Sequence, residues 1–463
     1  MFVGLLCLAV FLAMALAMSA RKLSALLALP LMAFLMSLIG GIPPEAIVKD
    51  VFSAGSVKLH NAYTATMFGA MLAELMNKHG MARALVRFVA EFAGDSPYIL
   101  GLMLTAVTAL LFSTLGGLGA VIMVGTIILP VMLSIGISGL AAAGLFLFGI
   151  SLGGMFNLTN WQLYTDVLKV EQAAIISFVV PFALILASVI LFFLLLELKE
   201  KRNLPYFFGS ICALGLLYFP LTAFGNSAAE KGDNSLSYPL AGALLLALSL
   251  YALYRKASGA VGLPGVALLT PLVPLAFVLI FRWDIIPAFL MGLAFGTLAT
   301  WSKDSISLLT RAIIDGVSNV IPAVLLMMGI GMLIQAVMDP HVANAIAPII
   351  KWAVPSSPFF YVLVFTLIAP FALYRGPLSL WGMGSGLVSL VLKVTSLTPQ
   401  AVMGMLMSVG QIQGVCDPTN TQNIWIATYL GVDTQLILRK TMPYAWLAVL
   451  LGLSLAVFKG YVP

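Results

Sequence analysis

The stretch CDPTNTQ at 416–422 decides the fold, because it interrupts an apolar run and has a counterpart, FNLTNWQ, at 156–162. Each stretch places hydroxyl and amide side chains inside a segment that otherwise reads as a membrane helix. A break in such a helix frees backbone carbonyls and amides, which then need other partners. The two stretches therefore predict two broken helices, at 139–168 and 398–430.

The same spacing recurs elsewhere in the chain. The run GSVKLHN beginning at Gly55 corresponds to the run GVSNVIP beginning at Gly316. A polar interruption follows each run. The interruption at 113–117 predicts the tip of a re-entrant helical hairpin over 97–136. The interruption at 374–379 predicts the tip of a second such hairpin over 357–395. Matches that keep one order at nearly one offset indicate an internal repeat.

Composition assigns the chain to a membrane. Of its 463 residues, 62% are hydrophobic and 9% are charged, and the mean hydropathy is +1.10. A soluble domain of this size could not cover its surface with so few charges. The net charge of +6 is interpreted as a topology signal from basic loops rather than as a nucleic-acid surface.

These observations predict an all-α, polytopic membrane protein with about twelve crossings. The first repeat covers 1–196, with scaffold helices in 1–93 and a last helix at 171–196. Two linking helices lie in 197–261, and the second repeat covers 262–463, with scaffold helices in 262–337 and a last helix at 434–459. Each half contributes five crossings and one hairpin, so the intervening crossings predict that the second half is inverted.

The distribution of basic residues predicts the orientation. Most basic loops, including the cluster at 197–202, fall on one side, which places both termini outside a cell inner membrane and leaves the polar loop 225–237 outside. Segment 2–20 has its basic residues after it and is read as a retained helix. Glu74 and Lys78 have the spacing of a helical ion pair. No disulfide is expected among Cys7, Cys212 and Cys416.

Inverted repeats with discontinuous helices that meet near the midplane are the architecture of alternating-access carriers. The run Thr419-Asn420-Thr421 resembles the Ser-Asn-Thr signature of the divalent-anion/sodium symporters, and Leu158-Thr159-Asn160 is a weaker partner. The repeat layout is similar to that of the ion transporter superfamily, which also contains citrate and gluconate carriers. The resemblance implies an elevator mechanism and a homodimer. Both hairpin tips depart from the family pattern.

Arg375 is the sharpest candidate for substrate recognition. A guanidinium at a re-entrant tip is costly unless it faces water or an anion, and its planar fork suits a carboxylate. The alternative is a structural pair with Asp417. Asp417 precedes Pro418 at the second break and could ligate Na⁺ or carry a coupling proton.

The remaining candidates share positions at the tips and the breaks. Half-helix carbonyls and hydroxyl or amide side chains there could bind substrate or Na⁺, and the alternative is that they only cap the breaks. Glycines at the tips are expected to permit tight turns. The predicted substrate-binding residues are Ser113, Thr114, Gly116, Gly117, Asn157, Thr159, Asn160, Arg375, Gly376, Ser379, Gln413, Asp417, Thr419, Asn420 and Thr421, and the candidate Na⁺ ligands are Asp417, Thr419 and Asn420.

The sequence therefore predicts a Na⁺- or H⁺-coupled carrier of small organic anions such as citrate or dicarboxylates. It predicts no cofactor beyond Na⁺ as a coupling ion, and no partner beyond the substrate, the lipid bilayer and a second copy of the chain. One alternative is a cation/proton antiporter in which Asp417 binds the exchanged ions. Another is an intramembrane enzyme using His60 and Asp417, for which no nucleophile or metal motif is present in the sequence.

Overall fold

The computed structural model describes residues 2–20, 22–94, 96–198, 203–227, 236–258, 262–355, 357–376, 378–382 and 384–463. Every regular element within these ranges is a helix, and they contain no strand, so the predicted all-α class is confirmed. The basic residues at 199–202 and most of the predicted outer loop, from 228 to 235, lie outside the described residues.

The described chain contains six helices that are long and apolar enough to cross a membrane, or up to eight if each of two bent helix pairs forms one span. The sequence prediction of about twelve crossings is higher because it also counted shorter apolar helices. Two of these, Ala25–Gly40 and Ile285–Ala299, have 16 and 15 residues, fewer than the roughly 20 that a perpendicular crossing needs.

The first half begins with a scaffold of helices and ends with a hairpin and a broken helix. A π-helical segment at Ile47–Ala54 and a break at Lys58–Leu59 flank the start of the sequence run that begins at Gly55. The elements are α1 (Phe2–Ser19), α2 (Ala25–Gly40), α3 (Pro44–Ala46), η1 (Ile47–Ala54), α4 (Gly55–Val57), α5 (His60–Lys78), α6 (Met81–Ala93), α7 (Pro97–Phe112), α8 (Gly117–Ser134), α9 (Gly139–Met155), α10 (Leu158–Leu168) and α11 (Gln172–Leu198).

The second half has the same order of elements. The linking helices α12 (Leu204–Ser227) and α13 (Ser237–Ser258) precede it, and they pack against α11 and α15 respectively. Its elements are η3 (Gly265–Leu269), α14 (Leu272–Leu279), α15 (Ile285–Ala299), α16 (Ser305–Met338), α17 (Pro340–Ala353), α18 (Pro358–Ile368), η4 (Ala369–Arg375), α19 (Gly384–Val394), α20 (Pro399–Cys416), α21 (Thr421–Leu430) and α22 (Thr434–Phe458).

Helices in the second half begin at positions that correspond to helix starts in the first half, at the same spacing as the matching sequence runs. Pro97 begins α7 and Pro358 begins α18, while Pro44 begins the segment α3–α5 and Ser305 begins its counterpart α16. Both prolines at positions 97 and 358 follow a serine, which is the expected sequence for a helix start. Local start signals thus recur in register along both halves.

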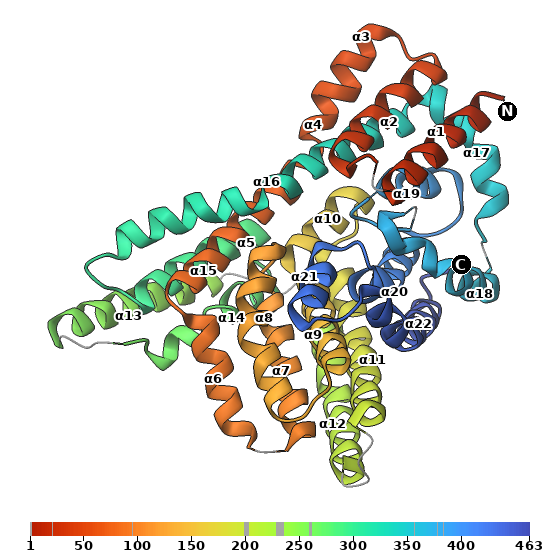
Figure 1. Ribbon diagram of the computed structural model, residues 1–463. Helices are drawn as coiled ribbons and strands as arrows, with labels where there is room; N and C mark the ends of the chain where they lie inside the picture. Colours follow the sequence, from red (N-terminus) through yellow and green to blue (C-terminus); the bar gives the residue numbers. More distant parts are fainter. Residues whose placement is uncertain are drawn as a thin grey trace.

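The long counterparts α5 and α16 cross closely and run antiparallel (Figure 1). A Cβ at Gly55 would lie 2.7 Å from the Cα of Met332, and a Cβ at Gly316 would lie 2.8 Å from the Cα of Met71. These two contacts are exchanged by the repeat, because Gly55 corresponds to Gly316 and Met71 to Met332. Only glycine permits the two backbones to approach this closely. Antiparallel counterparts related by exchanged contacts are the arrangement that an inverted repeat requires.

A second group of helices packs beside this crossing. Helix α20 packs against α22 and α9, α7 packs against α9, and α11 packs against both α22 and α9. Figure 1 shows α9, α11, α20 and α22 clustered together, with α16 and α5 extending away from them. The first segments of the two broken helices, α9 and α20, therefore lie together in the interior of this group, where most of their side chains are buried.

The two hairpins are not alike. In the first, α7 and α8 are regular helices joined by a tip at 113–116. In the second, the predicted hairpin over 357–395 consists of α18 and the 3₁₀ segment η4 before the tip and of the 11-residue α19 after it. Non-helical backbone angles at Leu373 and Tyr374, with a positive φ at Tyr374, mark the point where the helix ends. The second hairpin therefore has two helical arms as predicted, but it is less regular than the first.

Candidate functional site

The break between α20 and α21 is closed by side-chain amides. Helix α20 ends at Cys416, which leaves its last carbonyls without backbone partners. The side-chain amides of Asn420, Gln422 and Asn423 donate to three successive carbonyls, those of Gln413, Gly414 and Val415, over 2.7, 2.9 and 2.9 Å. The first turn of α21 thus folds back to cap the end of α20.

The break between α9 and α10 is closed in the same way. The two helices are bent by 53°. Asn160 donates its side-chain amide to the carbonyl of Gly154 over 2.8 Å, and Trp161 donates its indole N–H to the carbonyl of Met155 over 2.7 Å. Asn160 and Asn420 are counterparts in the repeat, so equivalent asparagines donate hydrogen bonds across both breaks.

Asp417 joins the second break to the second hairpin tip. Its side chain is fully buried. One carboxylate oxygen accepts from the backbone N–H of Tyr374 over 2.8 Å, and the other accepts from the N–H and the hydroxyl of Thr419 over 2.9 and 2.6 Å. Backbone and hydroxyl donors therefore satisfy both oxygens of this buried carboxylate.

Asn157, the counterpart of Asp417, makes the equivalent connection in the first half with the opposite polarity. Its side-chain oxygen accepts from the N–H of Thr159 over 3.0 Å, as the oxygen of Asp417 does from Thr419. Its amide then donates to the carbonyls of Phe112 and Leu115 at the first tip, over 3.1 and 3.0 Å. We call the contacts of Asn157 and Asp417 the two tip clasps.

Other predicted tip residues make local contacts. Ser379 is buried and donates to the side-chain oxygen of Gln413 over 2.8 Å, which adds a second link between the tip and α20. Ser113 and Thr114 donate to the carbonyls of Leu110 and Leu111 and so cap the end of α7. Thr421 begins α21 and is exposed.

The glycines at the two tips differ in the space that a side chain would have. A Cβ at Gly376 would collide with the carbonyl oxygen of Phe371, whereas Gly116 and Gly117 face open space. Gly117 has a φ of +82°, which favours glycine. The side chain of Arg375 lies outside the described part of the chain, so the pair predicted between Arg375 and Asp417 stays a prediction.

Two hydrogen bonds join the halves near the breaks. Trp381, which follows the second tip, donates its indole N–H to the side-chain oxygen of Asn160 over 3.1 Å. Ser151 on α9 donates to the side-chain oxygen of Gln411 on α20 over 2.7 Å. The polar residues of the two breaks and of the second tip therefore belong to one buried region, and sequence reasoning missed Ser151 and Trp381 within it.

The first tip is joined to that region through Asn157, and its glycines face the scaffold. A cavity of about 340 Å³ separates Gly116, Gly117 and Gly119 from the polar faces of α5 and α16. Its polar lining consists of Glu74, Asn77, Asp315 and Asn319. We call this space the acidic vestibule.

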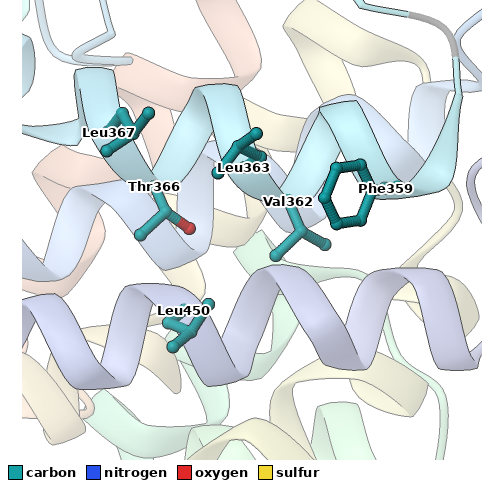
Figure 2. A pocket seen from close by; sticks show the side chains of 6 residues that line it. All are labelled: Phe359, Val362, Leu363, Thr366, Leu367 and Leu450. Carbon is teal, nitrogen blue, oxygen red and sulfur yellow. The ribbon is translucent and has the colours of Figure 1, made fainter.

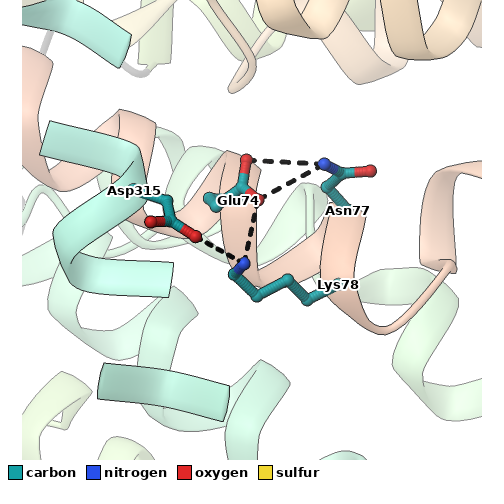
Figure 3. Close-up of polar contacts among 4 residues, drawn as sticks. All are labelled: Glu74, Asn77, Lys78 and Asp315. Atoms are coloured by element: carbon teal, nitrogen blue, oxygen red, sulfur yellow. Dashed lines mark hydrogen bonds and ion pairs between the residues drawn. The ribbon is translucent and has the colours of Figure 1, made fainter. Parts of the chain in front are cut away.

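Lys78 organises the carboxylates at the edge of the acidic vestibule (Figure 3). The predicted pair with Glu74 is present at 3.4 Å, and Lys78 also contacts Asp315 of α16 at 2.6 Å. Asn77 points its amide toward Glu74. This cluster joins α5 to α16 within the scaffold.

A separate groove between α18 and α22 carries no comparable chemistry (Figure 2). Its volume is about 230 Å³ and its lining is Phe359, Val362, Leu363, Thr366, Leu367 and Leu450. One hydroxyl among apolar side chains cannot hold a small anion, so the buried polar region is the better candidate for an anion site.

Asp166 is a buried carboxylate that sequence reasoning did not select. It accepts from the backbone N–H of Ala62 over 3.0 Å and from the side-chain amide of Gln162 over 3.1 Å. Ala62 lies in the first turn of α5, directly after the break, where amides need acceptors. A carboxylate inside a membrane helix was the signal that could have found it.

The positions of His60 and Asp417 do not support the alternative of an intramembrane enzyme. The ring of His60 is exposed, and its Nδ1 lies 3.1 Å from the carbonyl of Val57, whereas Asp417 is buried among the contacts described above. No group of three or more His, Cys, Asp or Glu side chains that could hold a metal ion occurs among the described residues.

Comparisons with known proteins give little further guidance. No protein-family model matches the chain, and no curated protein matches its sequence. Among solved structures it is similar to the YdaH transporter of Alcanivorax borkumensis, whose crystal structure is described as revealing an unusual topology. The identity is 15%, the match covers 90% of this chain and 88% of that one, and the TM-score is 0.49. At these values the likeness assigns neither family nor substrate.

Proposed function

We propose that this chain is a secondary transporter that moves small organic anions, such as citrate or a dicarboxylate, with Na⁺ or H⁺. The observation that carries the proposal is the meeting of two inverted halves at their broken helices, where Ser151 contacts its counterpart Gln411. Alternating access needs such a pair of halves, because each half can adopt the conformation of the other. A static receptor or an enzyme has no use for this relationship.

The tip clasps support substrate binding between the tips and the breaks. Asn157 and Asp417 hold each tip against a broken helix, so a tip and a break move together. Half-helix ends and hydroxyl or amide groups of the breaks would then contact the bound substrate. Thr159, Asn160, Ser379, Gln413, Thr419 and Asn420 are the neighbouring polar residues.

Arg375 is proposed to bind the carboxylate of the substrate. Asp417 already accepts three hydrogen bonds from Tyr374 and Thr419, so it does not require the guanidinium as a partner. A cation at the tip would then be free to pair with an incoming anion. The counterpart of Arg375 is the neutral Thr114, so recognition of charge would fall mainly to the second half.

Na⁺ is proposed to bind at the second break. Asp417, Thr419 and Asn420 supply a carboxylate, a hydroxyl and an amide oxygen, and hard oxygen donors suit this ion. Proton coupling through Asp417 is the other form of the proposal. The competing function is cation/proton antiport, with Asp417 binding the exchanged ions and Arg375 serving as a structural residue.

An elevator motion is proposed to carry the site across the membrane. The tips, the broken helices and the helices α11 and α22 would move as one body against the scaffold built on the α5–α16 crossing. The glycine contacts of that crossing give it the close packing expected of a fixed element. A second copy of the chain would pack on the scaffold to form a homodimer.

Uptake by reconstituted vesicles tests the proposal. Labelled citrate and dicarboxylates would be offered to purified protein under an imposed Na⁺ or pH gradient, with Arg375→Ala and Arg375→Lys as variants. We expect loss of anion uptake in Arg375→Ala, with partial retention in Arg375→Lys, while any ion exchange persists. Unchanged uptake of every anion in Arg375→Ala, or cation exchange without anion uptake in the parent protein, would contradict it.

A further inference from the structure

Helix α6 packs against the rest of the chain along one face. Met81, Ala82 and Val86 form that face and are almost fully buried. The helix contacts α5, α7, α8 and η3, and Figure 1 shows it at the edge of the molecule beside α7. The other face of such a helix meets water or lipid, so the side chains on that face indicate its surroundings.

Two rows of side chains occupy the other face of α6. Arg83, Arg87 and Glu91 follow one another at intervals of four residues, and all three are exposed. Phe88 and Phe92 form the neighbouring row, in which the rings are 59% and 78% exposed. Each residue turns an α-helix by about 100°, so the phenyl row lies more than a quarter of a turn around the helix from the row of charges.

The charges determine the depth at which α6 can lie. Arg83 near its start and Glu91 near its end are both exposed, and a charged side chain that faces hydrocarbon is costly. The helix therefore fits the boundary between headgroups and acyl chains along its whole length. Charges on one side and large apolar side chains on the other are typical of helices that lie in this boundary.

We propose that α6 binds anionic phospholipid, with Arg83 and Arg87 at the phosphate and its charged headgroup and with Phe88 and Phe92 among the acyl chains. Within the described part of the chain, neither guanidinium takes part in an ion pair or a hydrogen bond. The planar fork of arginine suits phosphate oxygens. A second copy of α6 is a poorer partner, because two arginines against one glutamate leave both surfaces positively charged.

The counterpart of α6 in the second half lacks the arginines. Helix α17 has Asn344 and Pro348 at the positions that correspond to Arg83 and Arg87. The repeated fold therefore does not itself require these charges. Since the halves are inverted, α6 and α17 belong to opposite sides of the membrane, and we expect the preference for anionic lipid on one side only.

Lipid binding by the full-length protein tests the role of the arginines. Purified protein in detergent is titrated with phosphatidylglycerol, or with phosphatidylcholine of the same acyl chains, and bound lipids are counted by native mass spectrometry. One arginine beside an anionic surface contributes about a factor of five in affinity, so Arg83→Gln with Arg87→Gln should bind phosphatidylglycerol about thirtyfold more weakly. The affinity for phosphatidylcholine should not change.

Two further double variants serve as controls. Arg83→Lys with Arg87→Lys keeps both charges and should keep most of the preference, and Lys49→Gln with Lys351→Gln removes two other exposed charges and should keep all of it. Inorganic phosphate should not displace phosphatidylglycerol, because it lacks the acyl chains. Displacement by phosphate, or equal phosphatidylglycerol affinity in the parent and in the glutamine variant, would overturn the inference. So would dissociation of a dimer by the glutamine variant with its lipid preference intact.

Chemical labelling tests the depth of the helix. Cys7, Cys212 and Cys416 are replaced by alanine, and Glu91→Cys or Phe92→Cys is introduced. A polar, uncharged maleimide is added to the protein in phosphatidylglycerol nanodiscs, which leave both membrane faces open to the reagent. We expect the cysteine at position 91 to react about tenfold faster than the one at position 92, because only the first faces water. The two should react equally after denaturation. Equal rates in the nanodiscs would place the phenyl row outside the acyl chains and refute the proposal.

Discussion

Ser151 donates a hydrogen bond to the side chain of Gln411 over 2.7 Å, and the two residues occupy the same position in the two halves of the chain. In any arrangement with two-fold pseudosymmetry, a residue can touch its own counterpart only near the axis. The axis therefore passes between α9 and α20, close to the point where a Cβ at Gly414 would lie 3.1 Å from the hydroxyl of Ser151. The α5–α16 crossing obeys the same relationship through its exchanged glycine contacts.

Exchanging the polarity of either tip clasp should destabilise the protein. Asn157→Asp would place a carboxylate against the carbonyls of Phe112 and Leu115, and Asp417→Asn would turn an amide toward the N–H of Tyr374 or Thr419. Each change leaves buried polar groups unsatisfied, so we expect a loss of about 1–3 kcal/mol and a lower melting temperature in detergent. The same substitutions at exposed positions, Asn344→Asp and Asp284→Asn, serve as controls and should have little effect. Equal melting temperatures in all four variants would show that the clasps are dispensable.

Sequence reasoning succeeded where a signal is local and periodic. Apolar runs, the prolines that start α7 and α18, and the two polar breaks located most helices within a few residues. Sequence reasoning failed where contacts between distant parts of the chain determine the local structure. The break at Lys58–Leu59 lacks a proline, and it is stabilised by Asp166, more than one hundred residues later.

The candidate site was predicted in part for the same reason. Residue type identified Asn157, Asn160, Asp417 and Asn420, because amides and carboxylates are rare inside membrane helices. Their partners could not be foreseen, since hydrogen bonds to carbonyls depend on the path of the backbone. The sequence also offered no means to see that Asn157 donates to its tip while Asp417 accepts from its own.

The two tips should tolerate a methyl group differently. Gly376→Ala would drive its Cβ into the carbonyl oxygen of Phe371, so the second tip must shift, at a cost of about 1–3 kcal/mol. Gly116→Ala is the matched control, because Gly116 faces open space and its φ of −155° suits any residue. Thermal unfolding of both variants measures the difference. If Gly116→Ala unfolded at a lower temperature than Gly376→Ala, the expected difference in space between the two tips would be contradicted.

His79, at the end of α5, should make stability depend on pH. Burial lowers the pKa of its ring from the ordinary value of 6.5, and its Nε2 is buried without a hydrogen-bond partner in the described chain. A lowered folded-state pKa means that the unfolded chain binds the proton more tightly. The stability is therefore complete above pH 6.5 and is lost as the pH falls below that value toward the folded-state pKa.

His79→Leu removes the titrating group and isolates this effect. Unfolding would be followed from pH 8 down to pH 5 in both proteins, and the difference between their stabilities should be constant above the ordinary pKa and shift in favour of the variant below it. The comparison cancels every other acid-sensitive group that the two proteins share. Parallel curves over the whole range would mean that His79 is protonated as easily in the folded protein as in the unfolded chain.

Asp166 should hold the first turn of α5 in place. Its carboxylate accepts from the N–H of Ala62 and adds a negative charge at a helix start, where it interacts favourably with the helix dipole. Asp166→Ala removes the acceptor and should cost about 1–3 kcal/mol, whereas Asp166→Asn keeps one oxygen and should cost less. Hydrogen exchange at residues 60–66 would accelerate most in the alanine variant. Asp284→Ala is the control, because Asp284 precedes α15 without a side-chain capping bond. If exchange at α5 rose equally in the alanine variant and in this control, the contact with Ala62 would have no part in stabilising the break.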